Sequence, residues 1–259
     1  MSGAEGVVGY ERRDATAVIT FDRPSARNAM TWRMYNQLDE ALDRVAADSD
    51  VRVALLRGAG GHFVAGTDIT QFAGFRSGDD GIAYEEQLEV VIAKLESLRV
   101  ATIAAVQGSA VGAGLVLAAA CDLRVATPDA RFGVPIARTV GNCLSMPNYA
   151  RLVAALGPSR TKAMLLTTDL MPAEEARASG FVAAIVEPDA FDAQIDALCS
   201  RIATYAPLTI QATKEAVRRV VSRSMVDGDD LLLRAYGSND FREGVAAFIE
   251  KRAPQWEGR

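Results

Sequence analysis

Residues 106–122, which read VQGSAVGAGLVLAAACD, constrain the fold of this chain more than any other stretch. An apolar strand leads into a turn of small residues, and an alanine-rich helix follows it. Because Gly112, Ala113 and Gly114 carry almost no side chain, another group can approach their main chain closely. The first amides of a helix have no intrahelical partner and lie at the positive end of its dipole. The segment therefore predicts a backbone site for an oxyanion or, more simply, tight packing of the helix on its strand.

Apolar runs and helical patterns alternate through the first two thirds of the chain. Strands are expected at residues 15–22, 51–57, 101–106 and 123–126, and helices after the capping residue Thr31 and at residues 83–98 and 112–120. This order is typical of parallel strands with crossover helices. After Pro188 only helical patterns remain, so the sequence predicts an α/β chain that ends in helices. The glycine-rich run at residues 74–81 is expected to be a mobile surface loop.

Composition narrows the classes of function. With 259 residues, 49% of them hydrophobic and 24% charged, the chain can bury a substantial core. Its 28 Lys and Arg against 33 Asp and Glu give a net charge of −5, which argues against nucleic acid as a partner. Charged residues and glycines interrupt every apolar run before the ~20 residues that a membrane span requires. Residues 1–14 lack the pattern of a secretory signal, so we expect a cytoplasmic protein without membrane contact.

Cysteine and histidine usage argues against metal sites and disulfides. Cys121, Cys143 and Cys199 are odd in number and far apart, which is typical of reduced thiols in a core. His62 is the only histidine, which argues against a multi-histidine metal site and against a Ser–His–Asp triad. We therefore expect no metal, and we interpret His62 as a loop residue.

A second glycine-rich segment, GHFVAGTDITQF at residues 61–72, follows the expected strand at residues 51–57. Together with residues 106–122 it resembles the enoyl-CoA hydratase/isomerase, or crotonase, superfamily. The resemblance extends to FDRPSARNAM (21–30), RFGVP (131–135), LTTDLMPAEEARASGFVAAIVE (166–187), APLTIQATKEAV (206–217) and FREGVAAFIEKRAP (241–254). It implies a crotonase-like spiral of ββα units at residues 1–190 that holds an acyl-CoA site. It also implies that residues 191–259 form helices that assemble trimers or dimers of trimers.

The resemblance implies a mechanism that depends on the main chain. In this superfamily the carbonyl oxygen of a coenzyme A thioester lies between two backbone N–H groups, which match Thr67 and Ala113 here. Two fixed amide dipoles stabilise a developing enolate or tetrahedral oxyanion without reorganisation. Ala113 suits this role if its φ is negative. Coenzyme A enters as part of the substrate, and we expect no permanently bound cofactor.

Further residues are expected to contact the coenzyme or the acyl group. By the same resemblance these are Ala26, Arg27, Ala65, Gly66, Asp68, Ile69, Gly112, Val116 and Ile136, and Phe248 and Lys251 are expected to approach the coenzyme of a neighbouring subunit. Simpler interpretations remain for several of them. Arg27 is then a solvent-facing loop residue and Asp68 a helix cap, while Phe248 and Lys251 are the buried and exposed residues of an ordinary helix.

The chain departs from the superfamily at two positions. Hydratases of this superfamily carry two glutamates that share a water, and the matching residues here are Val116 and Ile136. Neither apolar side chain can transfer a proton, and general acid–base catalysis contributes typically ~10²- to 10⁴-fold. We therefore expect isomerase, lyase, decarboxylase or hydrolase chemistry on an acyl-CoA. Two alternatives are a hydratase by ancestry with weak hydration and a non-catalytic acyl-CoA-binding protein.

Polar groups for a different reaction are available on the helix at residues 83–98 and in the loop after FGVP. They are Tyr84, Glu85, Glu89, Arg138, Thr139 and Asn142. We expect Glu89 to transfer the proton and Arg138 to orient an anionic acyl group, with Glu85 on the same helix face as Glu89. The alternative is that Glu85, Glu86 and Glu89 form the solvated face of an amphipathic helix. The sequence leaves open the acyl group, the reaction and the choice between trimer and hexamer.

Overall fold

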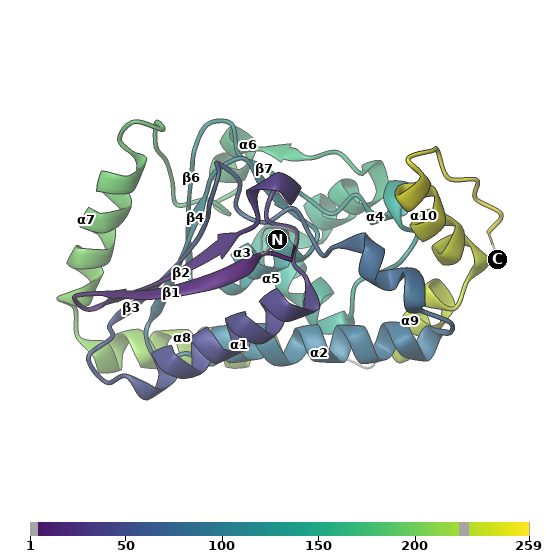
Figure 1. The fold of residues 1–259 in the computed structure, drawn as a ribbon. Helices are drawn as coiled ribbons and strands as arrows, with labels where there is room; N and C mark the ends of the chain where they lie inside the picture. Colours follow the sequence, from purple (N-terminus) through teal and green to yellow (C-terminus); the bar gives the residue numbers. More distant parts are fainter. Residues whose placement is uncertain (1–4, 223–227, 259) are drawn as a thin grey trace.

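A six-stranded sheet with the spatial order β1-β2-β3-β4-β6-β9 forms the centre of the fold (Figure 1). The computed structural model describes residues 5–222 and 228–258. The strands of this sheet are β1 (Val7–Arg13), β2 (Thr16–Asp22), β3 (Val53–Gly58), β4 (Ala101–Val106), β6 (Leu123–Ala126) and β9 (Ala184–Ile185). Only β1 and β2 pair antiparallel, whereas β2, β3, β4, β6 and β9 are joined in parallel. A smaller sheet contains β5 (Ser109–Val111), β7 (Arg131–Gly133) and β8 (Met171–Pro172).

The structure confirms the four expected strands and the predicted α/β order. It adds β1, an edge strand whose mostly polar and exposed sequence gave no alternating apolar signal. In the first part of the chain the helices are η1 (Pro24–Ala26), α1 (Trp32–Ala47), η2 (Ile69–Gly74), α2 (Gly78–Ser97) and α3 (Ala113–Ala120). Thr31 caps α1 as expected, because its side-chain oxygen accepts a hydrogen bond of 3.3 Å from the Met34 amide.

The later part of the chain is mostly helical. Its helices are α4 (Ile136–Thr139), α5 (Met146–Thr167), α6 (Ala173–Ala178), α7 (Phe191–Ala203), α8 (Pro207–Ser222), α9 (Asp229–Tyr236) and α10 (Asn239–Glu250). The helical path of α5 breaks at Gly157, whose φ is 76°, and resumes at Pro158. Helix α7 lies on the sheet, where Phe191 and Ile195 belong to the same core cluster as Val53. Helices α9 and α10 lie at the other end of the molecule, beside α2 and α4 (Figure 1).

The run at residues 74–81, expected to be a mobile loop, contains the start of α2 instead. Ser77 and Asp80 form a capping box that begins this helix. A Cβ atom added at Gly78 would overlap Leu233, and one added at Gly81 would overlap the Tyr236 ring. The loop expectation was wrong because these glycines allow α9 to approach α2, a close contact that a single sequence does not reveal.

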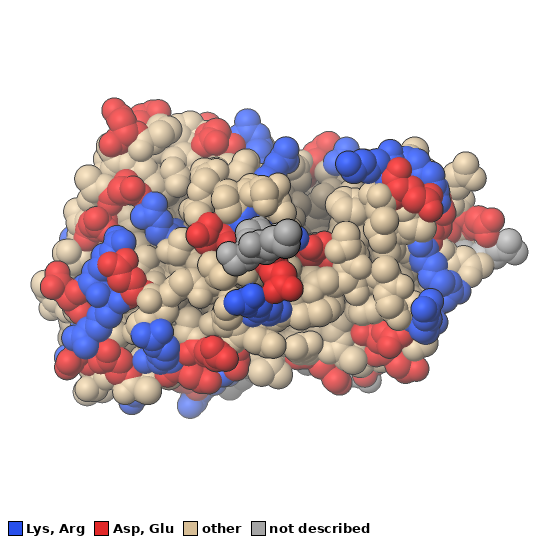
Figure 2. Space-filling model, in the orientation of Figure 1, with Lys and Arg blue, Asp and Glu red and all other residues tan. Residues whose placement is uncertain are grey.

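The surface of the described chain carries both signs of charge. Figure 2 shows basic and acidic side chains interspersed over one face. No helix among residues 5–222 and 228–258 is long and apolar enough to cross a lipid bilayer. Helix α8 contains no buried residue, and Leu208, Val217 and Val220 are exposed on it. The single chain therefore leaves an apolar helix face uncovered.

Candidate functional site

The two glycine-rich segments meet at a cavity of about 620 Å³. Main-chain hydrogen bonds of 3.0 Å join Val64 N to Ser109 O and Val111 N to Val64 O. The turns approach so closely that a Cβ added at Gly112 would lie 3.5 Å from Gly66 Cα. Small residues in both segments therefore bring two stretches of main chain, far apart in the sequence, to one cavity wall.

Thr67 and Ala113 both line this cavity. Ala113 is the first residue of α3, so its amide has no intrahelical acceptor, and its φ is negative, as the sequence required. Gly112 caps the helix at φ 57° and ψ −123°, a conformation that favours glycine. Among the described residues, no acceptor is paired with the Thr67 or the Ala113 amide. Two such amides are available to an oxyanion of a bound ligand.

Hydrogen bonds of the Thr67 side chain hold this turn in place. Its Oγ1 is 2.7 Å from the Tyr35 hydroxyl and 2.8 Å from the Tyr84 hydroxyl. Both tyrosines are buried, and burial raises the pKa of Tyr84 well above its usual value. Sequence reasoning did not find the pair, because Tyr35 appears in the sequence only as one apolar position of α1. The three hydroxyls hold the Thr67 amide at the cavity wall.

The residues expected around the coenzyme line the same cavity. They are Ala26, Arg27, Ala65, Gly66, Asp68, Ile69 and Gly112. Asp68 is the expected cap, since its Oδ1 accepts a hydrogen bond of 3.1 Å from Thr70 N at the start of η2. Its Oδ2 pairs with Arg23 at 2.8 Å. Partial burial opposes ionisation of Asp68, but hydrogen bonds from Thr70 and Arg23 outweigh it and lower the pKa.

An apolar wall faces the other part of the cavity. Val116 lies three residues after Ala113 on α3, and therefore on the same side of that helix, and it lines the cavity. Ile136 begins α4 and also lines the cavity, together with Val134 and Leu144. Val116 and Ile136 thus contribute hydrocarbon to this wall.

Glu85 is a buried carboxylate at the cavity, with a side chain that is 3% exposed. Its Oε2 accepts hydrogen bonds from Ser145 N at 3.1 Å and from Asn148 Nδ2 at 3.3 Å. Its Oε1 accepts one from the Tyr236 hydroxyl at 2.9 Å. Burial raises the pKa of Glu85, and these hydrogen bonds offset part of that effect. A carboxylate with a raised pKa is suited to proton transfer near neutral pH.

The structure corrects the expected positions of Glu89 and Arg138, the two polar residues that were expected to act on the acyl group. Glu89 does not line the cavity: it lies one turn further along α2, where both its oxygens pair with Arg151 of α5 at 2.6 Å. Arg151 also binds Glu96 at 2.8 Å, so this cluster joins α2 to α5. Arg138 is exposed on α4 and is not a cavity residue. Both expected positions were wrong. Helical spacing alone does not show which neighbour each turn of α2 faces, and the run after FGVP gives no signal for the direction of the Arg138 side chain.

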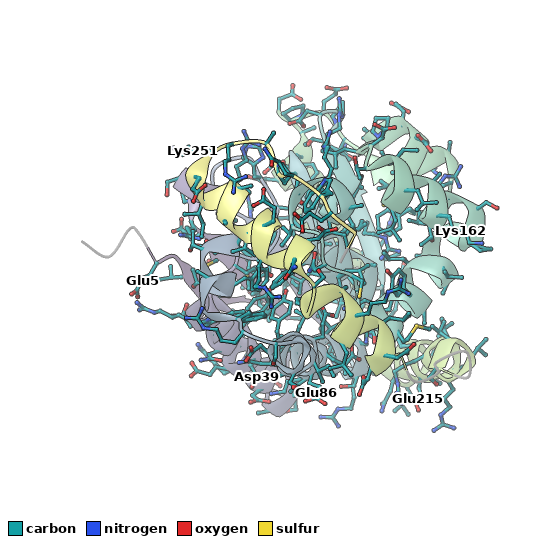
Figure 3. All side chains as sticks on the ribbon, turned by 90° about the vertical axis from the view of Figure 1, so that its right-hand side faces the viewer. Glu5, Asp39, Glu86, Lys162, Glu215 and Lys251 are labelled. Atoms are coloured by element: carbon teal, nitrogen blue, oxygen red, sulfur yellow. The ribbon has the colours of Figure 1, made fainter. Side chains whose placement is uncertain are left out.

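The alternative, that Glu85, Glu86 and Glu89 form a solvated helix face, is correct only in part. Glu86 is exposed, and Figure 3 shows it at the edge of the molecule. Glu85, its neighbour in the sequence, is buried and lines the cavity, because successive side chains point about 100° apart around a helix. One helix therefore carries an exposed glutamate and a cavity glutamate at consecutive positions.

The carboxy-terminal helix α10 packs beside η2 and α4 of its own chain. Phe248 lines the cavity of the same chain, although the resemblance pointed to the coenzyme of a neighbouring subunit. Lys251 ends α10 with φ 55° and is not a cavity residue (Figure 3). Its approach to a neighbouring coenzyme stays a prediction.

The loop role of His62 is confirmed. Its Nδ1 accepts a hydrogen bond of 3.2 Å from Ser109 N, and its carbonyl accepts one of 2.7 Å from Asn28 Nδ2. His62 thus ties the two glycine-rich segments together and does not line the cavity. The three cysteines are free thiols, and within the described ranges no group of three or more His, Cys, Asp or Glu is placed to bind a metal ion.

Comparisons with known proteins agree with this architecture. A sequence model described as enoyl-CoA hydratase/isomerase matches residues 11–259. The chain is 34% identical over 253 residues to a probable enoyl-CoA hydratase of Mycobacterium tuberculosis, covering 96% of this chain and 97% of that protein. It is 31% identical over 252 residues to the 2,3-dehydroadipyl-CoA hydratase of Escherichia coli, covering 96% and 97%.

Solved structures with this fold include an enoyl-CoA hydratase/carnithine racemase from Magnetospirillum magneticum, with a TM-score of 0.80, 33% identity and coverage of 97% and 96% of the two chains. They also include a methylmalonyl-CoA decarboxylase in complex with 2-nitronate-propionyl-CoA, with a TM-score of 0.88, 25% identity and coverage of 97% and 98%. With a match over almost its whole length and two amide-bearing turns at one cavity, this chain belongs to the enoyl-CoA hydratase/isomerase family.

Proposed function

We propose that the protein is an enzyme that binds an acyl-CoA thioester in this cavity and stabilises its enolate or oxyanion with the Thr67 and Ala113 amides. The proposal rests on the observation that Thr67 and Ala113 both line one cavity and that their amides have no acceptor among the described residues. Fixed donors of this kind stabilise charge that develops on a thioester oxygen, because they need no reorganisation during the reaction. The solved relative that holds 2-nitronate-propionyl-CoA supports a thioester ligand.

We further propose that the reaction is not the hydration performed by a glutamate pair. Val116 and Ile136 make that part of the wall apolar, so a water placed there has no side chain to orient it or to take its proton. Isomerisation, decarboxylation, thioester hydrolysis and C–C cleavage remain compatible with the same oxyanion site. Each of them passes through an enolate or a tetrahedral intermediate on the thioester.

Glu85 takes the role that the sequence first gave to Glu89. Within the described ranges, the only carboxylates that line the cavity are Asp68 and Glu85, and Asp68 is held by Arg23. Glu85 lies on the same cavity as the two amides and has a raised pKa. Where the enolate forms by loss of a proton, as in isomerisation, the Glu85 carboxylate takes that proton from the carbon next to the thioester carbonyl, and the electron pair moves onto the oxygen between the two amides.

A panel of acyl-CoA thioesters, analysed by mass spectrometry after incubation with the protein, tests the proposed function. We expect at least one thioester to be isomerised, decarboxylated, hydrolysed or cleaved, and crotonyl-CoA to be hydrated slowly. Rapid hydration of crotonyl-CoA would overturn the interpretation of Val116 and Ile136. Binding of coenzyme A thioesters in calorimetry without turnover of any of them would identify a non-catalytic acyl-CoA-binding protein instead.

A further inference from the structure

Helix α9 begins 132 positions after the end of α2 in the sequence and packs directly on α2 beside the cavity. Gly78 and Gly81 lie three residues apart on α2 and thus share one side of the helix, where Leu233 and Tyr236 take the space that side chains would fill. Glu85 is one turn further along the same helix. The two glycines therefore set the distance at which Tyr236 reaches the Glu85 carboxylate.

The hydrogen bonds around Tyr236 have a defined direction. Asn142 Nδ2 donates to the Tyr236 oxygen at 2.9 Å, and the Tyr236 hydroxyl donates to Glu85 Oε1 at 2.9 Å. An amide nitrogen only donates, so the tyrosine oxygen is occupied as an acceptor and its single proton is directed at Glu85. Ser145 N and Asn148 Nδ2 bind the other carboxylate oxygen, and the Ser145 side chain also lowers the pKa of Glu85, while Tyr236 donates to Oε1.

We propose that Tyr236 is a positioning residue that stabilises the ionised form of Glu85 and so sets the pH range in which Glu85 exchanges a proton with the substrate. This inference rests on the proposed function, which makes Glu85 the proton-transfer group. It assigns a part in the active site to α9, within the region for which the sequence predicted oligomerisation and, from Phe248 and Lys251, contacts with a coenzyme. Tyr236 itself is 1% exposed and does not line the cavity, so it acts through Glu85.

The other groups around Glu85 do not replace this hydrogen bond. Four side chains interact electrostatically with Glu85: Tyr35, Tyr84, Cys143 and Tyr149. Burial raises the pKa of each, so all four are neutral in the pH range where a carboxyl group titrates. Arg151 of α5 reaches Asn148 beside Glu85, but its charge is balanced by Glu89 and Glu96. Hydrogen bonds to neutral donors therefore stabilise the carboxylate.

Two substitutions of Tyr236 should move the pKa of Glu85 in opposite directions. Tyr236→Phe keeps the ring and removes the donor, so the pKa should rise by about one unit. Replacement of Tyr236 by 3-fluorotyrosine keeps the hydroxyl and makes it a stronger donor, so the pKa should fall. Tyr205→Phe, at an exposed tyrosine of the same chain, is the matched control and should change nothing.

Two measurements report the titration of the Glu85 carboxyl group. One is the infrared carboxyl band that Glu85→Gln removes, titrated with pH in the ligand-free protein. The other is the pH dependence of kcat and kcat/KM on a substrate found with the acyl-CoA panel, in which the limb that belongs to Glu85 should shift with the same sign. A role in packing alone would lower stability or kcat without moving either midpoint.

The two measurements separate the two proposals. If the infrared midpoint stays unchanged both in Tyr236→Phe and in the 3-fluorotyrosine protein, the inference about Tyr236 is wrong. If the infrared midpoint shifts as expected while Glu85→Gln leaves turnover unchanged, Tyr236 does position Glu85 but the proposed catalytic role of Glu85 fails. The 3-fluorotyrosine protein keeps every contact of the native side chain, so it gives an answer even if Tyr236→Phe does not fold.

Discussion

The Tyr236 hydroxyl donates a hydrogen bond of 2.9 Å to the Glu85 carboxylate, across 151 positions of the sequence. This contact joins the carboxy-terminal helices to the helix that carries the cavity carboxylate. It also explains why a buried glutamate is tolerated there, since Ser145, Asn148 and Tyr236 together satisfy both its oxygens. The active site we propose therefore draws on both ends of the chain.

Removal of one backbone donor should slow the reaction. Ala113→Pro deletes the amide N–H at the first position of α3, where proline is tolerated in a helix. We expect turnover to fall by roughly 10²- to 10³-fold, the usual cost of losing one oxyanion donor. Ala113→Gly keeps the N–H and is the control, which should retain turnover. Equal rates in the two variants would show that the Ala113 amide does not contact the reacting oxygen.

Hydration should respond to the two apolar positions. Crotonyl-CoA hydration by the unaltered protein should be at least ~10²-fold slower than that of a two-glutamate enzyme, and Val116→Glu with Ile136→Glu should raise it. Each new carboxylate enters an apolar wall, so thermal unfolding of each variant must be followed alongside the rate. A folded double variant with no gain in hydration would show that more than this pair separates the chain from a hydratase.

Stability should depend on pH through Glu85. Burial raises the pKa of Glu85 above 4.5, so the native state keeps its proton over a range in which the unfolded chain has lost it. Its contribution is therefore fully present below pH 4.5 and is lost as pH rises through the folded-state pKa. Glu85→Gln should remove this pH dependence, whereas Glu86→Gln should not. Chemical denaturation at a series of pH values measures both, and parallel curves for all three proteins would contradict the prediction.

Assembly should depend on the uncovered face of α8. Val217 and Val220 are 59% and 69% exposed in the single chain, although both are apolar. We expect a trimer or a dimer of trimers in sedimentation at micromolar concentration, and dissociation on Val217→Glu with Val220→Glu. Circular dichroism checks that the variant remains folded. A monomeric native protein would contradict the assembly that the sequence predicted.

The sequence predicted the parts of the molecule that depend on local pattern. The parallel strands and the Thr31 cap follow from periodicity and capping chemistry, and the resemblance to the superfamily pointed to the turns with Thr67 and Ala113, which the structure places at one cavity. It did not distinguish Glu85 from Glu89, because that choice depends on which helix faces each turn of α2.

The sequence also did not predict contacts between segments that are far apart in the chain. Gly78 and Gly81 predicted a loop, whereas in the structure they allow α9 to pack on α2. No local pattern in the sequence links Tyr236 to a carboxylate. Phe248, expected to approach the coenzyme of a neighbouring subunit, lines the cavity of its own chain. All of these positions depend on packing between segments that are far apart in the sequence, which a local pattern does not encode.

Deuterium exchange at the carbon next to the thioester carbonyl measures the proton transfer that we propose for Glu85. The protein is incubated in deuterated water with the acyl-CoA panel, and mass spectrometry follows incorporation into each thioester. We expect incorporation by the native protein and by Glu86→Gln, and a rate at least ~10²-fold lower for Glu85→Gln with unchanged coenzyme A binding. Exchange at the native rate in Glu85→Gln, or no exchange into any thioester that the native protein binds, would contradict proton transfer by Glu85.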